Sequence, residues 1–193
     1  MNLPIRSGEV WALVPARGGS KGIPRKNLLP LSGRPLISYS ILHGLSCPEI
    51  GRVIVSTDDE EIAAVSRAHG AEVPFLRPAE FATDGATDLD VFKHALELFS
   101  QQEKALPELV VHLRPTGPVR ELGVISAAVR QMLGTPEADA LRSVSLVLDT
   151  PYKMWRIENG FLSPLLTLPG RPEAHSAPRQ ELPPVYLQNG YVD

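Results

Sequence analysis

The sequence predicts an α/β fold in which a mainly parallel sheet lies between helices. Short apolar runs of strand length alternate with longer segments of helical period. The 193 residues suffice for one domain that buries well over half of its unfolded surface. A composition of 43% hydrophobic and 21% charged residues is that of an ordinary globular protein. We therefore expect a single doubly wound domain over residues 1–193, a Rossmann-like three-layer α/β/α sandwich.

The expected elements follow this alternation along the chain. Asp58, with Glu61 three residues later, is expected to cap the second helix, and Gly70 stands where that helix should end with positive φ. The predicted helices cover residues 35–45, 60–69, 89–99 and 122–133. The predicted strands cover residues 10–14, 52–56, 71–76, 109–113 and 141–147.

The pattern changes after Pro151. Residues 153–158 and 161–162, joined by Asn159-Gly160, predict a hairpin. Several prolines then fall between Pro164 and Pro184, where a regular helix or a central strand is hard to maintain. From the residues alone, an extended arm and a disordered linker remain two open interpretations of this region.

Charge and hydropathy restrict the partners and the location. A net charge of −3 argues against nucleic acid as a general partner. No apolar stretch has the length of a membrane span, and residues 1–8 lack the apolar core of a signal peptide. We therefore expect no membrane partner and a cytoplasmic location. Cys47 is the only cysteine, so an internal disulfide is excluded.

Residues 16–27, with the sequence A-R-G-G-S-K-G-I-P-R-K-N, form the most informative segment. They place a cluster of cations and glycines directly after the first expected strand. Glycine lets backbone N–H groups approach an anion, and clustered Lys and Arg neutralise several charges. The spacing matches neither the P-loop nor the dinucleotide-binding fingerprint. A solvated basic loop is the alternative, but the segment favours a site for a triphosphate.

This loop and the following L-x-x-L-x-G-x-P-L-I resemble the signature of the acylneuraminate cytidylyltransferases, also called CMP-sialic acid synthetases. The resemblance implies a fold of the sugar nucleotidyltransferase type and transfer of CMP from CTP to a nonulosonic, sialic-acid-like 2-keto sugar acid, with release of pyrophosphate. It also implies that residues 151–185 form a dimerisation arm, and hence a homodimer. Further matching segments follow in collinear order at residues 55–63, 77–87, 114–120, 178–183 and 189–191.

The resemblance implies roles for individual positions. The catalytic cations that clamp the triphosphate would be Arg17, Lys21 and Lys26. The nucleotide would be bound by Gly18, Gly19, Ser20, Asn27, Arg77, Ala86 and Asp88. The sugar would be bound by Arg114, Thr116, Arg120, Arg179, Gln180 and Asn189. Arg25 fills a variable place and is expected to be a surface charge. Arg120 has the alternative interpretation of an ordinary cation near the fourth helix.

Asp88 and Arg114 depart from the family's pattern. Asp88 stands where related enzymes tend to have Ser or Thr. Its carboxylate could accept from the amine of cytosine, but we favour an N-cap for the helix that begins at Leu89. Arg114 stands where sialic acid enzymes commonly carry a Gln that contacts the sugar. Because arginine is always charged and suited to carboxylates, we expect an acceptor related to N-acetylneuraminic acid rather than that sugar itself. Leu187 replaces an arginine of some relatives.

The metal ligands stay unknown from this sequence. The resemblance implies Mg²⁺ as cofactor, held by an aspartate pair beyond the N-G-Y segment. We expect these ligands beyond residue 193, in a longer polypeptide. Asp58, Asp59 and Asp84 are the remaining acidic candidates, and none has convincing spacing. Two other functions stay open: a CTP:KDO cytidylyltransferase, and a catalytically silent nucleotide-binding module that lacks the metal carboxylates.

Overall fold

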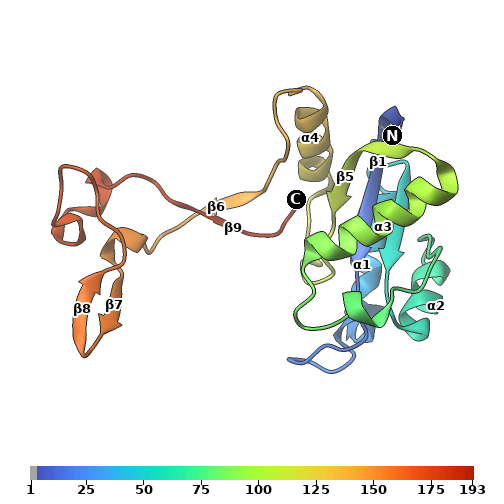
Figure 1. The fold of residues 1–193 in the computed structure, drawn as a ribbon, viewed down its shortest axis with the longest axis horizontal. Helices are drawn as coiled ribbons and strands as arrows, with labels where there is room; N and C mark the ends of the chain where they lie inside the picture. Colours follow the sequence, from blue (N-terminus) through green and yellow to red (C-terminus); the bar gives the residue numbers. More distant parts are fainter. Residues whose placement is uncertain (1–3) are drawn as a thin grey trace. The chain divides into compact units, whose positions relative to one another are not determined.

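The computed structural model describes residues 4–193, and the chain divides into two compact units. The first unit comprises the chain up to residue 142 together with residues 190–193, and the second unit comprises residues 143–189. Figure 1 shows the ribbon of both, coloured along the sequence. The arm predicted over residues 151–185 lies within the second unit. Its dimerisation and the single domain over the whole chain stay predictions.

A parallel sheet forms the centre of the first unit (Figure 1), and its strand order is β4-β1-β5. In the register, Trp11 pairs with Arg52 on one side and with Val110 on the other. The strands extend over Ile5–Pro15 for β1, Arg52–Ser56 for β4 and Leu106–His112 for β5. The α/β class is therefore confirmed, and β1 begins earlier than the sequence predicts.

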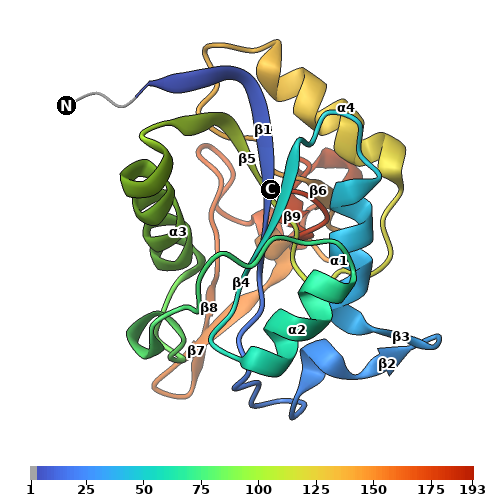
Figure 2. The ribbon, with the colours of Figure 1, turned by 90° about the vertical axis from the view of Figure 1, so that its right-hand side faces the viewer.

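Helices cover both faces of this sheet, because the side chains of β1 alternate between the faces. Val10, Ala12 and Val14 share a core cluster with residues of α1, α2 and α4. Trp11 and Leu13 share the opposite cluster with Ala95 and Phe99 of α3. Figure 2 shows α3 on one side of the sheet and α1, α2 and α4 on the other. The helices extend over Leu36–Leu45 for α1, Glu60–Ala68 for α2, Asp88–Glu103 for α3 and Leu122–Leu133 for α4. The three-layer arrangement is confirmed.

Two predicted strands do not join the parallel sheet as regular strands. Residues 71–76 make only isolated parallel bridges to the β4 region, at Glu72 and at Leu76. Pro74 lies between them and has no N–H to donate, which interrupts a regular ladder. Residues 141–147 do not join the parallel sheet, and only β6, Val144–Leu146, is a strand, in the second unit. Beside β5, the N–H of His112 instead donates to the carbonyl of Asp193 at 2.7 Å.

Both predicted helix caps are shifted by one residue. The carboxylate of Asp59, not that of Asp58, accepts the N–H groups of the first turn of α2. For α3 the N-cap is Thr87, which forms a capping box with Asp90, so the predicted cap at Asp88 is wrong. Asp88 is the first residue of the helix. Gly70 has the expected positive φ, 92°.

Short elements connect the strands and helices of the first unit. The 3-10 helix η1 extends over Lys26–Leu28, and the antiparallel strands β2 and β3 extend over Pro30–Leu31 and Arg34–Pro35. A further 3-10 helix, η2, extends over Ala79–Phe81. η1, β2 and β3 lie between β1 and α1, and η2 lies between α2 and α3. They form part of the segments that follow β1 and β4.

The second unit contains paired strands and short 3-10 helices. β6 pairs with β9, Tyr186–Gln188, and the predicted hairpin is formed by β7, Trp155–Glu158, and β8, Phe161–Pro164. Asn159 and Gly160 both have positive φ, as a tight hairpin turn requires. The 3-10 helices are η3, η4 and η5, over Pro151–Lys153, Ala174–Ser176 and Arg179–Glu181. Ala174, Ala177 and Leu182 form its small core.

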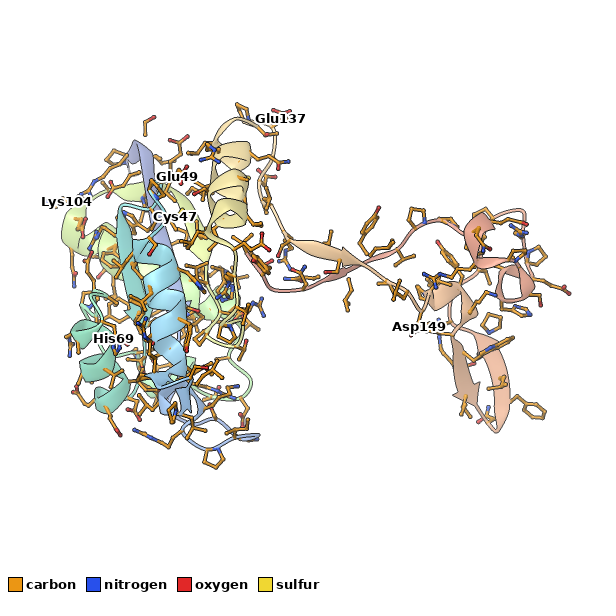
Figure 3. All side chains as sticks on the ribbon, turned by 180° about the vertical axis from the view of Figure 1, so that it is seen from behind. Cys47, Glu49, His69, Lys104, Glu137 and Asp149 are labelled. Carbon is orange, nitrogen blue, oxygen red and sulfur yellow. The ribbon has the colours of Figure 1, made fainter. Side chains whose placement is uncertain are left out.

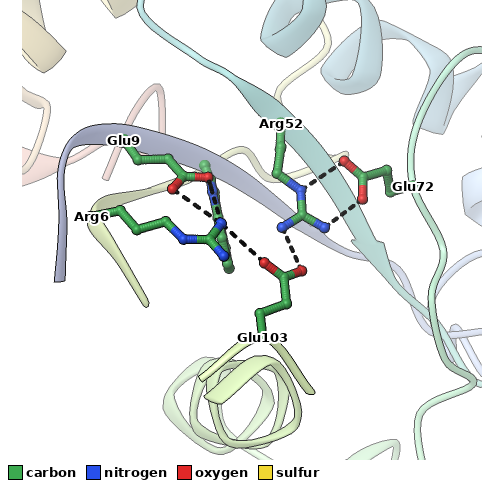
Figure 4. A network of polar contacts seen from close by, with 6 residues as sticks. Arg6, Glu9, Arg52, Glu72 and Glu103 are labelled. Atoms are coloured by element: carbon green, nitrogen blue, oxygen red, sulfur yellow. Dashed lines mark hydrogen bonds and ion pairs between the residues drawn. The ribbon is translucent and has the colours of Figure 1, made fainter. Parts of the chain in front are cut away.

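A network of ion pairs joins β1, β4 and α3 (Figure 4). The guanidinium of Arg52 lies 2.6 Å from Glu72 and 2.8 Å from Glu103, and Arg6 lies 3.1 Å from Glu103. Arg52 also stacks over the ring of Trp11, 4.5 Å from its centroid. These contacts lie where β4 begins, since Trp11 of β1 pairs with Arg52 there. They are therefore away from the carboxyl end of the sheet.

Figure 3 shows the side chains of the described residues and labels Cys47 and Glu49. Cys47 is buried, and its thiol lies 3.2 Å from the Glu49 carboxylate. Burial raises the pKa of the Cys47 thiol, as expected of a small core residue rather than a nucleophile. Among the described residues, no helix is both long enough and apolar enough to cross a membrane.

Candidate functional site

A cleft of about 400 Å³ opens in the first unit, where the segments that follow the strands of the sheet meet. The loop after β1, the segment that follows Leu76 and the segment after β5 all contribute residues to the cleft. This is the carboxyl end of the parallel strands, where α/β sheets bind ligands. The lining residues are Pro15, Arg17, Ser20, Lys21, Gly22, Lys26, Asn27, Arg77, Phe81, Thr83, Asp84, Ala86, Asp88, Val91, His112, Arg114, Pro115 and Thr116.

The glycine-rich loop is held in place from both of its ends. Buried Asn27 donates from Nδ2 to the carbonyl of Arg17 at 3.0 Å. The N–H of Gly18 donates to the carboxylate of Asp58 at 2.9 Å. A Cβ at Gly18 would lie 2.6 Å from Oδ2 of Asp59, so a larger residue would push the Asp59 side chain aside at the start of α2. Asn27 and Gly18 therefore hold the loop, and Arg17, Lys21 and Lys26 border the cleft.

The predicted clamp cations lie together in the lining. Arg17, Lys21 and Lys26 all border the cleft, with Ser20 beside them. Nη2 of Arg17 lies 2.9 Å from Asp84, and Lys21 also pairs with Asp84. Hydrogen bonding from Lys21, and then from Arg17, lowers the pKa of the Asp84 carboxyl. One wall of the cleft is thus lined by cations, and two of them already pair with the carboxylate of Asp84.

Arg25 forms ion pairs outside the cleft. It pairs with Asp59 and Glu61 at the start of α2, and its φ is 55°. It is not among the lining residues of the cleft. The expectation of a surface charge therefore agrees with its position.

Arg77 is buried beside the cleft. Its guanidinium donates to the carbonyl of Ser56 at 2.5 Å and to that of Phe81 at 3.2 Å. Burial lowers the pKa of Arg77, and its Nε has no hydrogen-bond partner among the described residues. Ala86 and Asp88, which were also assigned to the nucleotide, line the same cleft.

Arg114 and Thr116 bring the segment after β5 into the cleft. Nη2 of Arg114 lies 3.2 Å from Asp88 and 3.4 Å from Asp193. Thr116 follows in the lining. Two of the positions at which the sequence departs from the family's pattern, Asp88 and Arg114, therefore form one ion pair.

His112 is a lining residue that the sequence reasoning missed. It is buried, its ring packs edge-on against Phe92 with centroids 4.9 Å apart, and its Nε2 has no hydrogen-bond partner among the described residues. Burial, with a smaller effect of Arg114, lowers the pKa of His112 to about 4. The ring is thus neutral near pH 7. A polar residue at the end of an apolar strand was the available signal.

Arg120, which was assigned to the sugar, is not among the lining residues. It is buried and donates to the carbonyl of Tyr191 at 2.6 Å, to the carbonyl of Arg114 at 2.7 Å and to Oγ of Ser40 at 3.1 Å. Its guanidinium therefore fixes the backbone of the segment that carries Arg114.

The remaining sugar residues lie in the second unit. Arg179 and Gln180 begin η5 and border a recess of about 280 Å³ in that unit. Asn189 donates from Nδ2 to Oγ of Ser145 at 2.9 Å. The sugar-binding roles of all three stay predictions. In the part of the chain that the structure describes, no group of three or more His, Cys, Asp or Glu residues could hold a metal ion.

Comparisons with known proteins agree with the predicted resemblance. A family model described as cytidylyltransferase matches residues 11–158. The chain is 37% identical to a pseudaminic acid cytidylyltransferase of Campylobacter jejuni, over 63% of this chain and 52% of that protein. It is 38% identical to an N-acylneuraminate cytidylyltransferase of Escherichia coli, over 63% of this chain and 28% of that protein. A CMP-N,N'-diacetyllegionaminic acid synthase of Legionella pneumophila is also 38% identical, with 63% and 52% covered.

These curated relatives are longer than the matched segment, since the chain spans about half of their length or less. Among solved structures, a CMP:2-keto-3-deoxy-manno-octonic acid synthetase complexed with CTP is similar, with a TM-score of 0.61 and 18% identity. That similarity covers 95% of this chain and 73% of the other. At this level of identity it shows the shared fold.

Proposed function

Because this chain belongs to the cytidylyltransferase family, whose model matches residues 11–158, we propose that it transfers CMP from CTP to a nonulosonic acid and releases pyrophosphate. The observation that carries the proposal is the meeting of Arg17, Lys21 and Lys26 with Arg77 in one cleft at the carboxyl end of the sheet. This arrangement offers several positive charges to a triphosphate and buried donors beside it.

The reaction requires in-line attack of a sugar hydroxyl on the α-phosphorus of CTP. A bond forms between that hydroxyl oxygen and the α-phosphorus, and the hydroxyl proton passes to the solvent. The bond between the α-phosphorus and the oxygen that bridges to the β-phosphorus breaks, and this oxygen leaves with pyrophosphate. Negative charge builds on the phosphates as pyrophosphate leaves, so the protein acts by positioning and electrostatic stabilisation. Arg17, Lys21 and Lys26 would stabilise this charge, and the buried guanidinium of Arg77 would support the nucleotide beside Ala86.

The acceptor would be a nonulosonic acid other than N-acetylneuraminic acid. Arg114 and Thr116 would contact it, with the charge of Arg114 directed at a carboxylate. The sequence relatives support a nonulosonic acid as the class of acceptor, because their names include pseudaminic, N-acylneuraminic and diacetyllegionaminic acid. The alternative acceptor KDO has weaker support, since the similarity to the CMP:2-keto-3-deoxy-manno-octonic acid synthetase is one of fold at 18% identity.

Mg²⁺ is the proposed cofactor, and in such a reaction it would neutralise phosphate charge. The described residues do not by themselves form a site of three or more ligating side chains. A cytoplasmic location stays an expectation from the sequence.

A homodimer formed through the second unit is also proposed. Its hairpin exposes Ile157, Phe161 and Leu162, by 77%, 78% and 64%. Apolar side chains of this size are costly to leave in water, and a second copy of the chain is a simple cover for them. Sedimentation velocity should show a dimer for the wild type and a monomer for Phe161→Ser combined with Ile157→Ser. A wild type that stays monomeric at tens of micromolar would contradict the proposal.

The proposed activity is tested by pyrophosphate release from CTP with a panel of sugar acids. We expect release that depends on a nonulosonic acid and exceeds release with KDO. The control omits the sugar, and a second control replaces CTP with ATP. CTP binding without turnover of any sugar would instead favour the nucleotide-binding module.

A further inference from the structure

Asp84 occupies an unusual place in the cleft, because it is a carboxylate on the wall expected to hold phosphates. Its Oδ1 lies 2.9 Å from Nη2 of Arg17, and its Oδ2 pairs with Nζ of Lys21. Both cations come from the glycine-rich loop, whereas Asp84 comes from the segment between η2 and α3. Asp84 thus joins two loops through the charges that the proposed reaction needs.

A carboxylate and a phosphate compete for such cations, since each offers two or more anionic oxygens to the same donors. The competition is open to the solvent, because the side chain of Asp84 is 47% exposed and that of Lys21 is 78% exposed. Exposed ion pairs are weak and are screened by salt. A ligand with several phosphates can therefore displace the carboxylate from both cations.

The segment that carries Asp84 can move without disturbing the core. Thr83, Asp84 and Gly85 are exposed and lie outside the helices and strands of the fold. Thr87 begins α3 independently, through its capping box with Asp90. A shift of residues 83–85 would thus leave the helix and the sheet intact.

We propose that Asp84 is an internal counter-anion of the phosphate clamp, which a polyphosphate displaces and which pairs with Arg17 and Lys21 again when pyrophosphate leaves. This proposal rests on the proposed function. The carboxylate holds the two cations near each other before the substrate binds. It also lowers the affinity of the clamp for polyphosphates, and so favours the release of pyrophosphate.

A positioning role for Asp84 predicts the opposite change in phosphate affinity. If Asp84 only oriented Arg17 and Lys21 toward the ligand, removal of its charge would weaken phosphate binding. If it competes with the ligand, removal of its charge strengthens phosphate binding. The sign of the change therefore separates the two roles.

The experiment is calorimetric titration of the wild type, Asp84→Asn and Asp84→Glu with CTP, inorganic pyrophosphate and CMP. Glu80→Gln is the matched control, because it removes one negative charge from an exposed residue of the neighbouring η2. We expect Asp84→Asn to bind CTP and pyrophosphate about three- to tenfold more tightly than the wild type, as loss of competing exposed ion pairs implies. CMP affinity, Asp84→Glu and Glu80→Gln should stay within about twofold of the wild type.

Weaker or unchanged binding of pyrophosphate by Asp84→Asn would overturn the inference. An equal gain for CMP, or an equal gain in Glu80→Gln, would also overturn it, because it would indicate a general charge effect. Pyrophosphate also separates the two proposals. If the wild type binds pyrophosphate but not CTP, the proposed function fails while the comparison between variants still decides the role of Asp84.

Discussion

The guanidinium of Arg114 lies 3.2 Å from the carboxylate of Asp88, across the cleft lining. Asp88 is the first residue of α3, and Arg114 follows β5. Both residues depart from the pattern that the family resemblance implies, and the contact between them means that the two departures balance in charge. To pair with Arg114, the carboxylate of the acceptor would have to displace the carboxylate of Asp88.

This contact leads to a prediction about the acceptor. We expect the wild type to turn over legionaminic or pseudaminic acid with a higher kcat/KM than N-acetylneuraminic acid, and Arg114→Gln to reduce that preference. The reason is that an acceptor that does not pair with the half-exposed Arg114 loses a charged contact, worth about 0.2–1 kcal/mol at such exposure. Steady-state kinetics on the three sugars would measure it. A tenfold preference of the wild type for N-acetylneuraminic acid would contradict the role given to Arg114.

A double-mutant cycle checks the pair itself. Because the side chains of Arg114 and Asp88 are 38% and 52% exposed, their coupling should be small, about 0.2–1 kcal/mol. Urea denaturation of Arg114→Gln, Asp88→Ser and the double variant would measure it. Additive effects would show that the two departures are independent.

Lys26 should contribute directly to CTP binding. Lys26→Ala is expected to weaken CTP binding by about 1.5–3 kcal/mol, the usual contribution of a charged hydrogen bond. Isothermal titration calorimetry would measure the change. Lys93→Ala, which removes an exposed cation from α3 outside the cleft lining, is the matched control. Equal CTP affinity of Lys26→Ala and the control would end the assignment of the loop.

Gly18 and Gly19 offer a matched pair of substitutions. In Gly18→Ala the new Cβ would lie 2.6 Å from Oδ2 of Asp59, whereas at Gly19 it would meet nothing within 4 Å. Since Asp59 caps α2, Gly18→Ala should lower the free energy of unfolding by about 1 kcal/mol, the typical contribution of an N-cap. Gly19→Ala should stay within about 0.5 kcal/mol of the wild type. Thermal denaturation would measure both, and equal effects would disprove the close approach.

His112 predicts a pH dependence of stability. Its pKa is lowered to about 4 in the folded state, mainly by burial, from the usual value of 6.5. The unfolded chain therefore binds a proton at a higher pH than the folded chain, so the free energy of unfolding falls as pH decreases from 6.5 toward 4. The full effect is about 3 kcal/mol. His112→Gln should lose this part of the slope in urea denaturation at several pH values. An unchanged slope would show that His112 is not its source.

The sequence alone was sufficient for the features that depend on local chemistry. The alternation of apolar runs predicted the layers, because each strand and helix must bury one face. Asn159-Gly160 predicted the hairpin turn, because both residues tolerate positive φ. The cations and glycines of residues 16–27 predict an anion site, and the structure brings Arg17, Lys21 and Lys26 together in one cleft; anion binding itself stays a prediction.

Only the tertiary structure decided which residues contact one another over long separations. Whether Asp58 or Asp59 caps α2 depends on the glycine-rich loop, since the N–H of Gly18 donates to Asp58. Arg120 was assigned to the sugar by its place in a motif, yet burial against Tyr191 and Ser40 gives its guanidinium a structural role. The pairing of Asp84 with Arg17 and of Asp88 with Arg114 also depends on loops from different strands. Such contacts follow from the packing of the sheet and its helices, which brings together charges that are far apart in the sequence.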